Sequence, residues 1–278
     1  MTVITQREVV KFWRDLHLDN LELLRAVYIT HAFSPHAHEG FAIGVVQSGA
    51  TTTSYRKAHY DMPAGTIIVI NPGELHTGEA ASEQGWTYRM FYPKASLLQR
   101  IASELADHPR EIPFFPSPVI YDDHLAKLLL NLHRTLEDET SSVVERQSLF
   151  WWTMAQLIVR RADDSPVISK VKIERNCIKT VQKYIDTHYG DNISLERLAS
   201  IVNLNPCYML RLFSKAVGLP PHAYLTQVRI RQAKRLLKRG FPIADVAYQT
   251  GFVDQSHLTK QFKRVFGITP GQYVLSLN

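Results

Sequence analysis

Between about Leu23 and Met90, short apolar stretches are separated by polar turn residues. This part is rich in β-branched and aromatic residues, and turn signals such as Ser34-Pro35, Pro63-Ala-Gly65 and Asn71-Pro-Gly73 interrupt it at short intervals. Short strands separated by regular turns are typical of an antiparallel barrel or jelly roll. We therefore predict a β-barrel in the N-terminal part of the chain.

Three stretches that follow have the period of amphipathic helices, over residues 95–106, 122–136 and 143–161. The second and third present more apolar surface than one small barrel needs. They either pack as a bundle against the barrel or form a dimer contact, and the two interpretations are compatible.

From about residue 172 onward, every periodic stretch is helical, and Ala162-Asp-Asp-Ser-Pro166 has the composition of a linker. We predict a multidomain α+β protein: a barrel domain with C-terminal helices over residues 1–162, a linker over 163–171 and an all-α domain over 172–278. We expect no secretory signal and no membrane span, because no apolar run is long enough. The two cysteines, Cys177 and Cys207, form no CxxC pair, which suits a reducing cytosol.

The all-α part contains an internal repeat. Ala199 pairs with Ala247 at an offset of 48, and Phe213, Gly218, Pro221 and Tyr224 pair with Phe262, Gly267, Pro270 and Tyr273 at an offset of 49. Each copy has a short helix, a turn, a longer helix and then Gly-x-x-Pro-x-x-Tyr. This pattern predicts a duplicated helix-turn-helix, over about residues 195–217 and 242–267.

The longer helix of each copy divides into two faces. Helical spacing predicts that Met209, Phe213 and Ala216 point inward in the first copy, as do Leu258, Phe262 and Val265 in the second. The predicted outward residues are Cys207, Leu210, Arg211, Ser214 and Lys215 in the first copy, and Gln255, Ser256, Thr259, Lys260, Lys263 and Arg264 in the second. Short polar and basic side chains are the groups that read base edges in a major groove. Lys215, Lys263 and Arg264 are better placed to anchor phosphates.

The charge is concentrated in the same part of the chain. Residues 171–278 contain 16 Lys and Arg against 6 Asp and Glu, whereas the chain before them is slightly acidic. Taken alone, this asymmetry indicates either a polyanion partner for the C-terminal part or a well-solvated surface. Together with the two polar helix faces it predicts double-stranded DNA as the partner of that part.

The motif from Gly251 to Pro270, followed by Gln272-Tyr273, resembles the signature of the AraC/XylS family of bacterial regulators. So do Leu198-Ala-Ser-Ile-Val-Asn-Leu-Asn-Pro, Arg211-Leu-Phe and Gly218-Leu-Pro-Pro-His-Ala-Tyr. The resemblance covers about residues 193–273. It implies a seven-helix domain with two recognition helices in successive major-groove segments, about 34 Å apart. By this resemblance, the base-facing positions are Cys207, Leu210, Arg211, Gln255, Ser256, Thr259 and Lys260. Leu210 and Leu258 depart from the residues that are common in the family.

Two N-terminal segments, Pro35-His-Ala-His-Glu39 and Asn71-Pro-Gly-Glu-Leu-His76, are similar to the half-motifs of the cupin barrel, which the family uses as an effector-binding module. Metal-binding cupins add a carboxylate after the His-x-His pair, but here that region is Phe41-Ala-Ile-Gly44. Three histidines can bind zinc, so a metal site is one interpretation. Our prediction is instead that His36, His38 and His76 mark a pocket for a small organic effector, without a metal or another cofactor. Histidines bonded only to backbone groups are a third interpretation.

Arg89 is a further candidate for this pocket, as a cation for an anionic effector. It lies in an alternating strand, so it points either into the barrel or away from it.

Together these features predict a ligand-responsive, sequence-specific transcription regulator rather than an enzyme. Its expected partners are DNA, a small-molecule effector, RNA polymerase and a second copy of the chain, in the bacterial cytoplasm at the nucleoid. One alternative is a constitutive DNA-binding protein whose barrel serves only for dimerisation. The other is a metal-dependent cupin enzyme with a DNA-binding tail. The missing carboxylate argues against it, and we find no other base or nucleophile arrangement.

Overall fold

The computed structural model of the chain describes residues 8–166 and 175–277, which form two compact units. The first unit contains residues 8–137 and 150–166, and the second contains residues 138–149 and 175–277. The sequence places 138–149 in the first domain, whereas in the structure this segment groups with the second unit. The expected linker, 163–171, and the expected start of the second domain lie partly outside the described residues.

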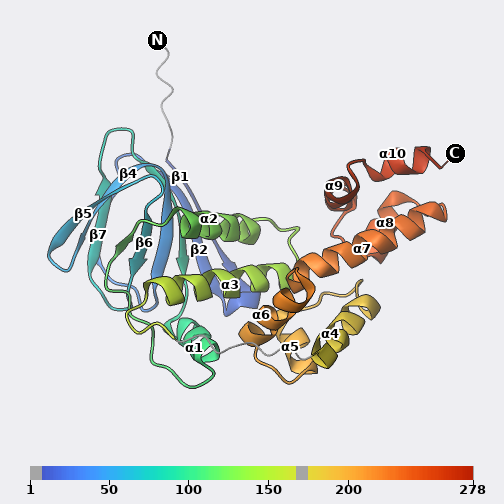
Figure 1. The fold of residues 1–278 in the computed structure, drawn as a ribbon. Coiled ribbons are helices and arrows are strands. Elements are labelled where there is room, and N and C mark those ends of the chain that lie inside the picture. Colours follow the sequence, from blue (N-terminus) through green and yellow to red (C-terminus); the bar gives the residue numbers. More distant parts are fainter. Residues whose placement is uncertain (1–7, 167–174, 278) are drawn as a thin grey trace, which may run out of the picture. The chain divides into compact units, whose positions relative to one another are not determined.

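The first unit contains an antiparallel β-domain (Figure 1). Its strands are β1 (Val9–Asp15), β2 (Leu21–Tyr28), β3 (Ala32–His36), β4 (Ala42–Tyr55), β5 (Ala58–Pro63), β6 (Ile67–Ile70), β7 (His76–Ala80), β8 (Trp86–Tyr92) and β9 (Val119–Ile120). A short 3-10 helix, Leu16–Leu18, connects β1 to β2. The antiparallel fold predicted from the turn signals is confirmed, although β1 begins well before Leu23.

Strand β4 joins the two halves of this β-domain. Its first half pairs with β6 and β8, and its second half pairs with β5 and β7, with a bulge between Val46 and Ser48. A bulge bends a strand and increases its twist. The bend in β4 therefore lets one strand take part in both sets of pairings. On one side the strand order is β1-β2-β8-β4-β6-β9, and on the other side β7 pairs with both β4 and β3.

Three helices follow the strands, namely α1 (Ala95–Ala106), α2 (Asp123–Glu137) and α3 (Val143–Arg161). The helices predicted from periodicity are confirmed to within one residue. Helix α2 packs on β4 and β8. The leucines at 125, 129, 132 and 136 are at most 2% exposed, so the apolar stripe of α2 is buried by contacts within this chain.

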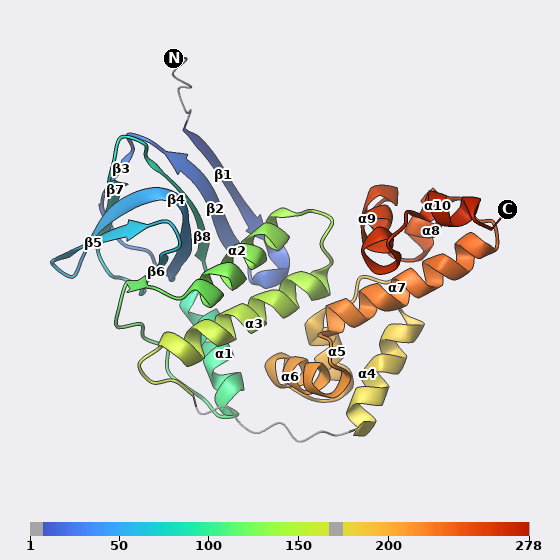
Figure 2. The ribbon, with the colours of Figure 1, turned by 45° about the horizontal axis from the view of Figure 1, so that its top comes forward.

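The second unit contains α4 (Arg175–Thr187), α5 (Leu195–Ile201), α6 (Pro206–Val217), α7 (Pro221–Lys238), α8 (Ile243–Gln249), α9 (Gln255–Phe266) and α10 (Pro270–Leu275). Figures 1 and 2 show α4, α5 and α6 beside one end of α7, and α8, α9 and α10 beside its other end. The duplicated helix-turn-helix is thus formed by α5–α6 and α8–α9. Within the described residues, no helix is long and apolar enough to cross a membrane.

Candidate DNA interface and effector pocket

Helix α9 has one buried face and one exposed face. Leu258 and Phe262 are fully buried in a core that they share with α7 and α8. Gln255, Ser256 and Lys260 are exposed, and Thr259 is half-buried. Lys263 and Arg264 are exposed in the last two turns. The structure therefore gathers all six candidates of the second copy on accessible parts of one helix.

Helix α6 differs from the expected arrangement at two candidate positions. Cys207 and Leu210 are 2% and 3% exposed, so their predicted outward placement is corrected. Two adjacent pairs of apolar residues are buried in this helix, namely Met209, Leu210, Leu212 and Phe213. The buried surface of α6 is therefore wider than a single stripe. Arg211 and Ser214 are half-buried and Lys215 is exposed.

Two inward predictions are also corrected. Ala216 is exposed, and Val265 is 47% exposed. Each lies in the last turn of its helix, and the core contacts are made by the turns before it.

Both longer helices begin and end in the same way. The side chains of Asn205 and Asp254 accept hydrogen bonds from the backbone N–H groups of Tyr208 and His257, at 2.7 Å in each case. Both helices end at glycines in the left-handed conformation, Gly218 and Gly267. A side-chain cap at the start and glycine at the end satisfy the free backbone groups of a helix. The repeat therefore encodes the boundaries of both longer helices.

A cavity of about 100 Å³ lies inside the β-domain. Its walls are largely apolar and aromatic, with Trp86, Tyr88, Met90 and Tyr92 from one strand, β8. His36, His38 and His76 line the same cavity, so the structure brings together the three histidines of the two half-motifs. A concave, largely apolar space with a few polar groups is the usual form of a small-molecule site.

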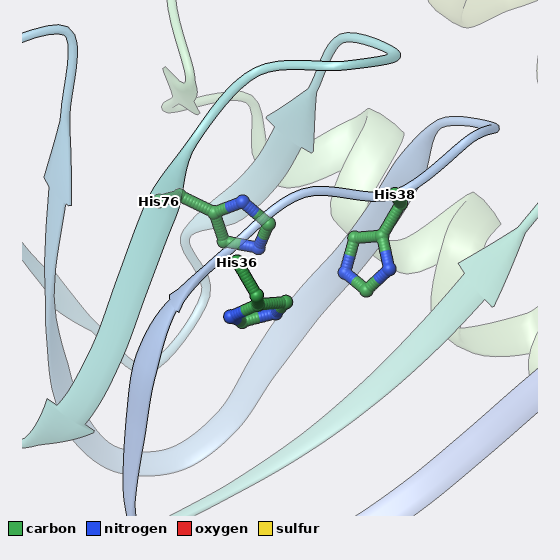
Figure 3. Close-up of side chains that lie close together, drawn as sticks. All are labelled: His36, His38 and His76. Carbon is green, nitrogen blue, oxygen red and sulfur yellow. The ribbon is translucent and has the colours of Figure 1, made fainter.

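The three imidazoles converge on one space (Figure 3). His36 and His76 are direct partners across β3 and β7, with ring centroids 4.3 Å apart. His38 follows the end of β3, and its ring centroid lies 5.0 Å from that of His36 and 5.2 Å from that of His76. One ring nitrogen from each residue lies within 4.8 Å of the other two.

Burial lowers the pKa of two of the three histidines. It lowers the pKa of His38 to about 4, with a smaller contribution from the neighbouring His76 and His36. Burial also lowers the pKa of His76, and it raises the pKa values of the Tyr88 and Tyr92 hydroxyls. At neutral pH the imidazoles of His38 and His76 are therefore neutral, and the hydroxyls of Tyr88 and Tyr92 keep their protons.

Arg89 does not line the cavity, and its assignment to the pocket is corrected. Its neighbours Tyr88 and Met90 line the cavity, so strand alternation directs Arg89 to the other face of the sheet. There it is 5% exposed and donates hydrogen bonds to Gln47, His133 and Glu137. Arg89 therefore cannot serve as a cation for an effector in this cavity.

Sequence reasoning missed the remaining polar and aromatic wall of the cavity, which includes Thr51, Thr53 and Tyr88. The signal was present as alternation, at positions 51 and 53 in β4 and at 86, 88, 90 and 92 in β8. Alternation groups these residues by face, but it does not say which face is inside.

An antiparallel β-domain with an internal cavity, followed by two helix-turn-helix units, defines a DNA-binding regulator with a ligand-binding domain. Residues 20–153 match the model of the AraC-like ligand binding domain, and residues 198–275 match that of a helix-turn-helix domain. The HTH-type transcriptional regulator YbfI of Bacillus subtilis is 30% identical over 91% of this chain and 90% of its own length. The chain belongs to the AraC/XylS family of transcription regulators.

Two further relatives extend over most of the chain. The HTH-type transcriptional activator RhaS of Escherichia fergusonii is 25% identical over 86% of each chain. The lactose operon transcription activator of Staphylococcus xylosus is 24% identical over 82% of this chain and 81% of its own. The similarity therefore covers both the ligand-binding and the helix-turn-helix parts.

Proposed function

We propose that this protein is a ligand-responsive regulator that inserts α6 and α9 into successive major-groove segments of its DNA site. A small-molecule effector binds in the β-domain cavity and changes the affinity for DNA. Linkage requires that DNA then changes the affinity for the effector by the same factor.

The observation that carries the DNA part of the proposal is the exposed face of α9. Gln255 has the donor and acceptor for adenine, and Lys260 is a donor for guanine. Both are exposed, while Leu258 on the opposite side is fully buried. The helix is thus held by its core face, and its polar face is accessible to a groove.

Helix α6 supplies fewer base readers in this proposal. Arg211 and Ser214 are its reading side chains, and Lys215 is a phosphate anchor, as are Lys263 and Arg264 in α9. Because Cys207 and Leu210 are buried, we leave them out of the reading set. The second copy accordingly carries most of the sequence discrimination.

The effector part rests on the cavity. Its aromatic and aliphatic walls suit the apolar body of a small molecule, and its imidazoles supply the polar contacts. A metal-dependent cupin enzyme remains the alternative from the sequence, and purified protein that turns over a substrate at this cavity would favour it.

The regulator also needs partners for its action on transcription. Two relatives are named activators, which favours RNA polymerase as a partner here. We further propose that the protein acts as a homodimer, bound to DNA in the bacterial cytoplasm. Sedimentation of the free protein and of its DNA complex tests the dimer.

The DNA proposal is tested with duplexes that the full chain selects from a random-sequence library. In a gel-shift titration, we expect Arg211→Ala and Lys260→Ala to weaken binding by about 1–3 kcal/mol each, since each removes a base contact. Lys238→Ala is the matched control, because it removes an exposed cation at the end of α7, outside both longer helices. Equal affinities for all four proteins would contradict the assignment.

A further inference from the structure

The three histidines of the cavity have the donor set of a metal site, and their rings converge on one space. We propose that His36, His38 and His76 bind one divalent transition-metal ion of the zinc class, which keeps an open coordination position toward the cavity. The effector then binds with a metal-coordinating oxygen or nitrogen on the ion and its apolar body against the aromatic wall. This inference replaces the metal-free pocket that we expected from the sequence. It deepens the proposed effector function and rests on it only for the identity of the fourth ligand.

The hydrogen bonds of two of these rings fix which nitrogen is available. His36 Nδ1 lies 2.8 Å from the backbone oxygen of Ser34, and His76 Nδ1 lies 3.2 Å from that of Glu74. A carbonyl oxygen only accepts, so both Nδ1 atoms carry the hydrogen and donate it. Both Nε2 atoms therefore have a free lone pair, and a backbone carbonyl orients each ring, as in the outer shell of metal-bound histidines.

The strand pairing supplies the spacing. His36 and His76 face each other in the register of β3 and β7, which places both rings on one side of the sheet. His38 approaches the same space from the segment after β3, where its ring also contacts that of Tyr92 in a tilted arrangement, with ring centroids 5.0 Å apart. Residues from two half-motifs 40 positions apart thus meet at one point.

The separation of the ligand atoms is compatible with a bound ion after a small contraction. One ring nitrogen of each histidine lies within 4.8 Å of one ring nitrogen of each of the other two. Tetrahedral zinc with bonds of about 2.0–2.1 Å needs nitrogens about 3.3 Å apart. All three side chains are only half-buried, so small side-chain rotations can bring the nitrogens together.

The donor set selects the class of ion. Three imidazoles without a carboxylate or thiolate suit zinc, copper, nickel, cobalt or ferrous iron, whereas calcium and magnesium require oxygen ligands. Three protein ligands leave one tetrahedral position for water or another molecule. Because the same histidines line the cavity, that position is accessible to a molecule bound there.

The test uses the untagged full-length chain, stripped with a chelator and titrated with Co²⁺, whose visible absorption reports its coordination. We expect one Co²⁺ per chain with the absorption of a tetrahedral site, displaced by Zn²⁺. His38→Gln and His76→Gln are expected to weaken binding by more than about tenfold. His59→Gln is the matched control, since His59 is an exposed histidine on strand β5, which pairs with β4, and we expect it to bind like the wild type.

Circular dichroism of each variant shows whether it is folded, and His36→Gln provides a third ligand variant if one of the others is not. An absence of stoichiometric Co²⁺ binding by the wild type would overturn the proposal. Equal binding by the folded ligand variants and by His59→Gln would overturn it as well.

Azide is the probe for the open position. We expect azide to change the Co²⁺ absorption of the wild-type protein, and an unchanged spectrum would overturn the open position. The same metal-loaded and stripped samples are then titrated with library-selected DNA. DNA binding without any Co²⁺ binding refutes only the metal site, whereas Co²⁺ binding without DNA binding refutes only the proposed regulator.

Discussion

Arg89 and Glu137 form an ion pair that joins strand β8 to helix α2. Arg89 Nη1 donates to Glu137 Oε2 at 2.6 Å, and the two side chains are 6% and 17% exposed. The same guanidinium donates to His133 Nδ1 at 2.9 Å. One face of β8 therefore holds the helix in place, while the alternate residues of the strand line the cavity.

Removing one partner of this pair leaves a buried charge without its counterion. We expect Glu137→Ala to lower the free energy of unfolding by about 3 kcal/mol, the range for a broken buried pair. All four tryptophans, at positions 13, 86, 151 and 152, lie in the first unit, so tryptophan fluorescence during urea unfolding reports on it. Glu22→Ala is the control, because its pair with Arg14 is exposed and is worth less than about 1 kcal/mol. Equal losses for the two variants would contradict the prediction.

His133 makes the stability of the first unit depend on pH. Burial, and secondly the neighbouring Arg89, lower the pKa of His133 from 6.5 to about 4. Because the unfolded chain takes up this proton first, His133 contributes stability above pH 6.5 that is lost as the pH falls toward 4. The full loss is about 3 kcal/mol, at about 1.4 kcal/mol per pH unit.

The measurement is the free energy of urea unfolding between pH 7 and pH 5, followed by tryptophan fluorescence. His133→Gln removes the titrating group, so we expect a smaller pH slope in this variant than in the wild type. If the free energy of unfolding changed with pH as steeply in His133→Gln as in the wild type, other groups would be the cause of the pH dependence.

Gly251 lies in the turn between α8 and α9 with φ +78°, and an added Cβ would lie 2.8 Å from both Gly190 O and Arg229 Nη2. Arg229 cannot easily move, because it is 6% exposed and donates to the backbone oxygens of Tyr189 and Asp191. We expect Gly251→Ala to be destabilising through both the left-handed backbone and this clash.

Gly267→Ala separates the two causes. Gly267 has φ +77° and no atom within 4 Å of an added Cβ. We expect it to cost about 1–2 kcal/mol for the backbone alone, and Gly251→Ala at least about 1 kcal/mol more for overpacking. Far-ultraviolet circular dichroism during thermal unfolding gives both values. A Gly251→Ala variant as stable as Gly267→Ala would exclude the clash.

Lys263 and Arg264 are predicted to contact phosphates rather than bases. Lys263→Ala should weaken binding to selected and to random DNA by the same factor. It should also reduce the dependence of log K on log salt by about 1, since one fewer counterion is released. Gln255→Ala, which removes no charge, should leave that slope unchanged and weaken binding only to selected DNA. Fluorescence anisotropy at several salt concentrations distinguishes the two patterns.

Local patterns predicted the elements of this chain well. Helices α1 and α3 have the bounds that periodicity gave them. Each of these features depends on residues a few positions apart, so the sequence alone contains the necessary information.

The site was less predictable because it depends on strand register and on burial. The alternation around Arg89 did not reveal which face was internal, and helical spacing did not reveal that Cys207 and Leu210 are buried.

The sequence by itself determined the two-part architecture, the duplicated helix-turn-helix and the concentration of positive charge in the second part. Only the tertiary structure decided that Arg89 faces α2, and that His36, His38 and His76 converge beside the aromatic wall. Local elements are set by neighbouring residues, whereas strand register is set by contacts between residues far apart in the chain.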